Sequence, residues 1–257
     1  MQDFGGSAWH KGAPRIGRMA LIHQAELRPS KIELIEGWVP TQPWFEGSAS
    51  ASLTSVGSFR FDDPNGEVGI ETLLVRAGDG PVLQVPLTYR GVPLVGGDAW
   101  IIGTMQHSVL GQRWVYDATG DPAYLAAVAT AALTGGRQAE QYIEIDGVRV
   151  LRESTAVVIG SGKNDAPVPP LSSAGTVSTR HDRGATVVEA GALRLVVARL
   201  LAPRRPQRSG SGWLAGFDDT ATLEVLTGTW TNQPCPQTLV QVQVQVQVQV
   251  QVQVQAG

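Results

Sequence analysis

The chain has 257 residues, of which 42% are hydrophobic, so it is long and apolar enough to form a folded core. Its formal net charge of −3 gives no broad electrostatic attraction to nucleic acid or anionic lipid, and neither is expected as a partner. Cys235 is the single cysteine, which excludes an intrachain disulfide framework and fits a cytoplasmic location. No run of about 18 apolar residues predicts a membrane span.

The first elements are short. Residues 1–18 lack the apolar stretch of a secretory signal and are expected to be a disordered leader, either an upstream start before Met19 or a genuine flexible arm. Residues 21–27 alternate loosely and suggest a first strand. Ser30 suits the N-cap of a short helix that we expect to stop near Gly37.

An aromatic, proline-containing corner follows at 38–47, before a predicted strand at 52–61. The corner can be interpreted as a ligand-stacking platform or as a hydrophobic plug against the sheet, and the plug is favoured because large aromatic side chains are usually core. Asp62 and Asp63 raise a metal hypothesis. The sequence 62–66, with its Pro-Asn-Gly ending, is far more typical of a turn.

The most regular stretch is a predicted antiparallel hairpin with strands at 67–76 and 81–90. Residues 77–80, with a glycine on each side of an aspartate, supply the positive φ that a tight turn needs. Two further strands are predicted at 98–105 and 112–116.

The second half begins with the clearest helix, capped by Asp121 with Pro122 in its first turn and ending at Gly135 and Gly136. Exposed loops are expected at 161–183 and 203–212. Strands are expected at 140–145, 148–151, 156–159, 185–189, 193–201 and 223–226. The chain is expected to form one domain over residues 19–232.

Residues 233–257 form a low-complexity tail that contains eight Val-Gln pairs between Val240 and Gln255. Period-2 alternation is typical of a strand, but an isolated strand cannot bury its apolar face. We therefore expect the tail to be disordered or to pair opportunistically, and we assign it no function. Its composition also predicts a tendency to aggregate.

No motif in the chain carries a complete catalytic or metal-binding set. Residues 160–164 resemble a phosphate-binding loop, but Val157 stands where the first glycine belongs and Asn164 replaces the magnesium-binding hydroxyl. His107 lies in a loop near other polar residues, and a surface histidine with a local hydrogen bond is the favoured interpretation. We therefore assign no catalytic residue, metal ligand or cofactor.

Three segments carry a family resemblance: Trp38–Phe45 (WVPTQPWF), Leu83–Arg90 (LQVPLTYR) and Val115–Pro122 (VYDATGDP). Together they resemble the N-terminal cap of actinobacterial maltokinases, over roughly residues 19–230. Pro43 stands where the family has arginine, and the glycine-rich turn after Phe45 is reduced. The resemblance implies an α+β fold with a curved antiparallel sheet and one or two packed helices, of cystatin-like cap architecture. In that family the cap is set against a bilobal kinase, and because this chain offers no set of catalytic and metal-binding residues for phosphoryl transfer, we expect a free-standing cap without the kinase lobes.

Three hypotheses follow. The first is an accessory or regulatory binding module of maltose, α-glucan and trehalose metabolism, which docks on a kinase or related enzyme, or binds an oligosaccharide through Trp38, Trp44, Trp100 and Trp114. The second is an enzyme, either an ATP-dependent sugar kinase component by family inheritance or a reduced kinase or hydrolase using Asp62, Asp63, His107, Arg113 and Asp117. The third is a purely structural domain. The residues expected on a ligand or partner surface are Trp38, Trp44, Arg90, His107, Arg113, Trp114 and Asp117.

Overall fold

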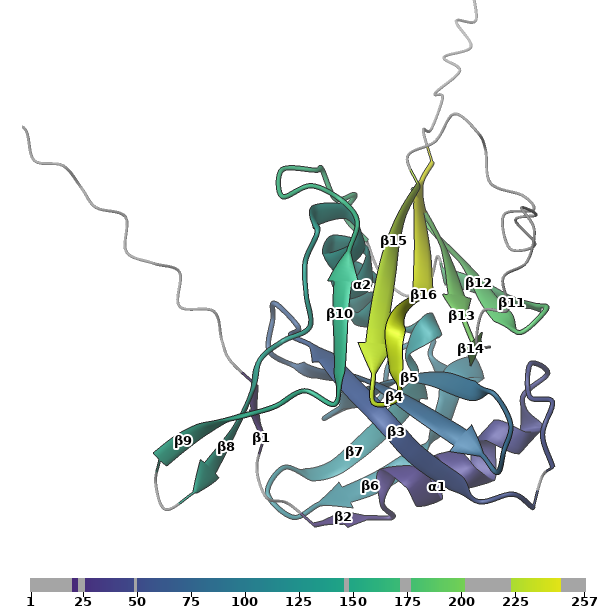
Figure 1. The fold of residues 1–257 in the computed structure, drawn as a ribbon. Helices are drawn as coiled ribbons and strands as arrows, with labels where there is room; N and C mark the ends of the chain where they lie inside the picture. The colour runs from purple at the N-terminus through teal and green to yellow at the C-terminus, as the bar shows by residue number, and fades with distance from the viewer. Residues whose placement is uncertain are drawn as a thin grey trace, which may run out of the picture.

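The computed structural model describes residues 20–22, 26–48, 50–145, 148–171, 177–201 and 223–245, which form three β-sheets and two α-helices (Figure 1). The fold is mixed α+β, mostly antiparallel, and its main sheets curl into a half-barrel, so the predicted fold class is confirmed at this level. The cystatin-like architecture stays a prediction.

The first large sheet, called the N-terminal sheet, contains the predicted central hairpin. Its strands lie in the order β2 (Leu27–Arg28), β6 (Ile101–His107), β7 (Gly111–Asp117), β5 (Val82–Arg90), β4 (Val68–Ala77) and β3 (Leu53–Phe61). Strands β4 and β5 pair antiparallel along their whole length, and the turn between them places Gly78 at φ 53°. The hairpin prediction is therefore confirmed, including the positive φ that required glycine.

Helix α1 (Lys31–Trp38) covers one face of the N-terminal sheet, and the 3₁₀ helix η1 (Val39–Thr41) continues it. A capping box starts α1, because the Ser30 hydroxyl accepts from the backbone N–H of Glu33 and the Glu33 carboxylate accepts from the backbone N–H of Ser30. The α-helix ends at Trp38, one residue after Gly37, close to the expected end. The buried side chains of Ile35 and Val39 hold this helix onto the sheet.

The second large sheet, called the C-terminal sheet, has six antiparallel strands. Their order is β10 (Ala156–Gly160), β15 (Leu223–Trp230), β16 (Gln233–Val244), β13 (Leu193–Ala198), β12 (Ala185–Ala190) and β11 (Val177–Asp182). A small third sheet, which projects from the body in Figure 1, contains β1 (Ala20–Ile22), β8 (Gln141–Ile145) and β9 (Val148–Arg152). Strand β1 pairs parallel to β8.

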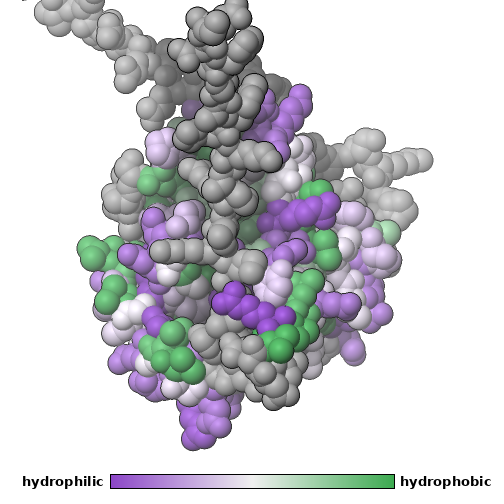
Figure 2. Space-filling model, turned by 90° about the vertical axis from the view of Figure 1, so that its left-hand side faces the viewer, coloured by the Kyte–Doolittle hydropathy of each residue, from purple (hydrophilic) through white to green (hydrophobic). Residues whose placement is uncertain are grey.

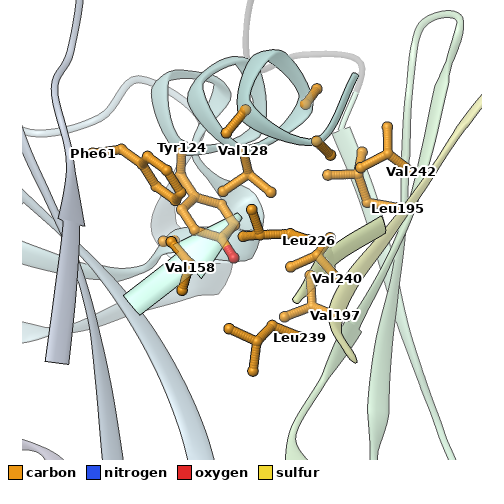
Figure 3. Close-up of a cluster of buried hydrophobic side chains, with 14 of the residues drawn as sticks. Phe61, Tyr124, Val128, Val158, Leu195, Val197, Leu226, Leu239, Val240 and Val242 are labelled. Atoms are coloured by element: carbon orange, nitrogen blue, oxygen red, sulfur yellow. The ribbon is translucent and has the colours of Figure 1, made fainter. Parts of the chain in front are cut away.

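Helix α2 (Pro122–Thr134) packs between the two large sheets and fills the main core. Asp121 caps its N-terminus and Gly135, at φ 70°, ends it, as predicted. Figure 3 shows Tyr124 and Val128 of α2 pointing at apolar side chains from the surrounding strands. Burial on the α1 side and on the α2 side explains why β5 is buried along most of its length.

Two of the loop and tail predictions are wrong. Strand β11 occupies the end of the predicted loop 161–183, and β16 makes residues 233–244 an inner strand of the C-terminal sheet. The domain therefore extends past residue 232. The loop prediction at 203–212 and the tail beyond residue 245 lie outside the described residues, as does the leader 1–18.

The Val-Gln alternation explains why the start of the tail can form a core strand. Val240 and Val242 are buried against the α2 side, so the intervening Gln241 points to the opposite face of the sheet. Strand β16 pairs with β15 on one side and β13 on the other. These two strands pair with its edges, and α2 covers the apolar face that an isolated strand would leave exposed.

Candidate functional site

The polar centre of the molecule lies where two strands share one edge of β5. Strand β7 pairs with β5 from Leu87 onward, whereas the two-residue strand β14 (Leu200–Leu201) pairs with Val82 and Leu83. Asp117 ends the first of these partners and Arg199 precedes the second. The two side chains meet in the gap between β7 and β14.

Arg199 and Asp117 form a fully buried ion pair. The Nη2 atom of Arg199 donates to Oδ2 of Asp117 at 2.6 Å and to Oδ1 at 2.8 Å, and the side chains are 0% and 5% exposed. Arg199 also donates from Nε to the hydroxyl of Thr186 at 2.7 Å, and from Nη2 to the hydroxyl of Thr119 at 3.2 Å. Its guanidinium lies 5.1 Å from the ring centre of Trp44, a cation–π distance.

A second ion pair links β5 to the start of α2. Arg90 donates from Nε to Oδ2 of Asp121 at 2.7 Å and from Nη2 to Oδ1 at 2.6 Å, a bidentate geometry. The hydrogen bonds to Asp121 raise the pKa of Arg90, against the effect of burial. Asp121 also accepts from the backbone N–H of Ala123, so one carboxylate caps the helix and anchors it to the sheet.

One branch of the Arg199 network reaches the surface. His181 lies on β11 and places Nδ1 at 3.2 Å from the Thr186 hydroxyl that accepts from Arg199. Burial lowers the pKa of His181, and the positive charge of Arg199 adds to this effect. A proton on His181 would therefore sit unfavourably close to a buried cation.

The structure buries two of the candidate site residues that were expected at a surface. Asp117 is buried in an ion pair with Arg199. Trp44 is 2% exposed and packs edge-to-face with Trp38, with 5.9 Å between the ring centres. The plug interpretation of the aromatic corner is therefore confirmed for Trp44, and the stacking-platform interpretation is wrong for it. Trp100 is partly exposed but donates its indole N–H to Thr179 of β11 at 3.2 Å.

The remaining candidates lie on the β6–β7 hairpin. The Nδ1 atom of His107 accepts from the backbone N–H groups of Val109 and Leu110 at 3.2 and 3.1 Å, and Arg113 donates to the carbonyl of Leu110 at 2.9 Å. The local-hydrogen-bond interpretation of His107 is thus confirmed. Trp114 is partly exposed on the same strand.

The residues of the enzyme hypothesis do not come together. His107 pairs with Gly111, which is six residues from Asp117 along β7, or roughly 20 Å at strand spacing. Asp63 accepts from the backbone N–H groups of Asn65, Glu67 and Val68, so it closes the predicted turn. Acid–base partners need hydrogen-bond reach, and His107 and Asp117 lack it.

The motif that resembles a phosphate-binding loop packs against α2. A Cβ on Gly160 would overlap the carbonyl oxygen of Ala131, and one on Gly162 would overlap that of Leu133. The backbone N–H of Gly162 donates to the carbonyl of Ala132 at 2.9 Å. The glycines therefore serve close approach to the C-terminal turn of the helix, which agrees with a loop at this position.

A further buried cluster was missed at the level of sequence. Glu71 of β4 pairs with Lys31, accepts from the hydroxyl of Tyr89 at 3.3 Å, and lies opposite Arg60 of β3. Burial alone would raise the pKa of Glu71, but the charges of Lys31 and then Arg60 outweigh it and lower the pKa. The opposed charges in two predicted neighbouring strands were the available signal.

Arg199 was also missed, although a charge inside an apolar run of a predicted strand signals a buried partner. Its partner could not be identified from sequence, because Asp117 is 82 residues away.

Within the described residues, no three His, Cys, Asp or Glu side chains lie together as a possible metal site. Neither helix among these residues is long and apolar enough to cross a bilayer.

The two ion pairs involve residues of the motifs found in the sequence. Asp117 and Asp121 belong to the segment 115–122, and Arg90 belongs to the segment 83–90. Residues 38–121 match the maltokinase N-terminal cap domain. The match confirms the family resemblance over this range and suggests a link to maltokinase and α-glucan metabolism. No curated protein matches the chain.

The cap-domain match ends at Asp121, so α2 and the C-terminal sheet lie outside it. All seven candidate surface residues fall within the match. Arg199, which neutralises Asp117, comes from the unmatched half. The two halves are therefore joined through a buried charge pair as well as through the apolar core.

Proposed function

We propose that the chain is an accessory binding protein of maltose, α-glucan and trehalose metabolism, and that it does not itself catalyse phosphoryl transfer. The cap-domain match at residues 38–121 carries this proposal. The burial of the two motif aspartates supports the absence of phosphoryl transfer. Asp117 and Asp121 are both buried against arginines, so they stabilise the fold and are not free to hold a metal ion or a substrate hydroxyl.

The surface of the matched region offers an apolar segment for a protein partner. Val92, Val95 and Ile101 are 68%, 88% and 43% exposed, and all three lie between the end of β5 and the start of β6. Because Trp100 beside them is anchored to β11, this segment is attached to both large sheets. We propose that it contacts a kinase or another enzyme of the same metabolism.

A second exposed apolar area is less suited to this role. Val148, Val150 and Leu151 of β9 are 62%, 41% and 53% exposed, but β9 lies outside the cap-domain match. On the face shown in Figure 2, hydrophobic groups are separated from one another by hydrophilic ones. The 92–101 segment is therefore the partner surface to test first.

The test is a pull-down from the native host followed by reconstitution with the purified partner. We expect the full chain to retain an enzyme of maltose, α-glucan or trehalose metabolism, and the double variant Val92→Asp/Val95→Asp to lose it. Val148→Asp/Val150→Asp is the matched control, since it adds the same two negative charges at exposed valines on the β9 surface.

Thermal-shift and phosphoryl-transfer assays complete the test. We expect no transfer from ATP–magnesium to maltose by the purified chain. Transfer that disappears on mutation would refute the non-catalytic part of the proposal. Failure to retain any such enzyme, together with no thermal shift by maltose or longer glucans, would refute the link to this metabolism.

A further inference from the structure

The small third sheet ends in a strand whose outer edge is open. Its strand order is β1–β8–β9, so β9 pairs with β8 on one side, and no strand of the described residues pairs with its other side. Figure 1 shows β8 and β9 extending away from the two large sheets. An open edge presents unpaired backbone N–H and C=O groups, which can pair with a further strand.

Apolar side chains of β9 are exposed on both faces of this sheet. Val148 and Val150 lie on one face and Leu151 lies on the other, and all three are exposed. A partner that contacts only one face would leave either the two valines or the leucine in water. A strand that adds to the edge of β9 covers part of all three side chains, so the pattern favours an added strand.

The charges along this edge favour a second copy of the same chain. Arg149 and Glu153 are exposed, and neither forms an ion pair within the described residues. Two identical strands that pair antiparallel are related by a two-fold axis, so their contacts occur twice, once in each direction. When the axis passes through Leu151, Arg149 lies opposite the partner's Glu153, and Glu153 lies opposite the partner's Arg149. Opposite charges that face each other across a strand pair are stabilising.

Other two-fold registers along β9 lack these charge pairs. An axis through Arg149 or through Arg152 places two arginines opposite each other, which is destabilising. An axis through Val150 places Arg149 opposite the partner's Leu151, so it brings no opposite charges together. The register centred on Leu151 also places Val150 opposite the partner's Arg152, whose aliphatic stem can cover the valine. Among the registers centred on residues 149–152, it is therefore the favoured one.

We propose that the chain forms a two-fold symmetric dimer through β9, in which residues 148–154 of two copies pair antiparallel with Leu151 at the axis. The two small three-stranded sheets then form one continuous sheet. Residues 148–154 are fewer than the roughly 20–30 residues that each side of a standard interface contributes, so the dimer is weak, with a Kd in the micromolar range. Strand β9 lies outside the cap-domain match, so this surface is separate from the 92–101 segment.

The test is sedimentation velocity of the full chain at concentrations below and above the expected Kd. Arg149→Glu and Glu153→Arg each replace two opposite-charge pairs with two like-charge pairs, so each should raise the dimer Kd about tenfold or more. Glu46→Arg is the matched control for Glu153→Arg, because it makes the same charge change at an exposed glutamate outside the small sheet. It should leave the Kd unchanged.

Two further measurements test the pairing itself. The double variant Arg149→Glu/Glu153→Arg exchanges the two charges and should recover the Kd of the unmodified chain. An equimolar mixture of the two single variants should form heterodimers, because the mixed pair has opposite charges at both positions. A surface that joins the copies elsewhere would show neither effect.

A chain that stays monomeric at every concentration overturns the proposal, even if β9 contacts another protein in the pull-down. A dimer whose Kd neither single variant changes also overturns it, and so does weakening by both single variants without recovery in the double variant. Urea unfolding should be the same for all variants, since the substituted side chains are exposed. None of these outcomes bears on the partner enzyme proposed for the 92–101 segment.

Discussion

Removing the charge of Asp117 should destabilise the protein far more than removing a surface carboxylate. Asp117→Asn leaves the guanidinium of Arg199, which is 0% exposed, without its counter-ion. Breaking a buried ion pair in this way costs about 3–5 kcal/mol. For a domain of this size, 1 kcal/mol corresponds to a change in Tm of about 2–4 °C, so the melting temperature should fall by roughly 6–20 °C.

The double variant Asp117→Leu/Arg199→Met tests the reasoning behind that value. Apolar replacement of both partners removes the unpaired charge and should recover part of the loss. Recovery should be incomplete, because Asp117 also accepts from the backbone N–H of Thr119 and Arg199 bonds two hydroxyls. The assay is urea unfolding followed by tryptophan fluorescence.

The control for this prediction is Glu26→Gln. Glu26 pairs with Arg28 at 3.3 Å, but both side chains are about four-fifths exposed, at 79% and 84%, so no measurable loss is expected. If Asp117→Asn costs less than about 1 kcal/mol, or if it costs no more than the control, the network around Arg199 does not contribute as the structure implies.

Three further predictions concern pH, the tail and the glycines. Burial lowers the pKa of His181, so the unfolded chain binds a proton below about pH 6.5 that the folded chain resists. Stability should therefore be complete above that pH and fall as pH decreases, and His181→Gln should flatten the slope in urea titrations; an unchanged slope would contradict this. Leu239→Ala, in the inner strand β16, should cost about 2–5 kcal/mol, whereas Leu223→Ala, at 36% exposure, should cost much less; equal losses would show that β16 is not core. Gly160→Ala should lower the free energy of unfolding by about 1–3 kcal/mol or more, because the added Cβ overlaps α2. Gly37→Ala has open space around it and should raise the free energy of unfolding by up to about 1 kcal/mol. Calorimetry measures both changes, and a stabilised Gly160→Ala or a destabilised Gly37→Ala would contradict the prediction.

Local signals predicted much of the fold. The Gly-Asp-Gly turn placed the β4–β5 hairpin, and Ser30 and Asp121 placed the starts of both helices. These features depend on residues within a few positions of one another, and backbone sterics and capping act at that range. The family resemblance was also readable, because its motif residues lie in the part of the chain that matches the cap domain.

The candidate site was less predictable, because exposure depends on distant partners. Tryptophan, arginine and aspartate in loops and strand ends suggested a surface. Trp44 and Asp117 instead surround Arg199, which the C-terminal half supplies.

The sequence by itself determined where most strands, turns and helix caps lie, and which family part of the chain resembles. Tertiary structure alone decided the role of the Val-Gln alternation. Period 2 says that a strand has one apolar face, but it does not say whether anything covers that face. Strands β13 and β15 provide edges for β16, and α2 covers Val240 and Val242, so residues that looked like a tail became core.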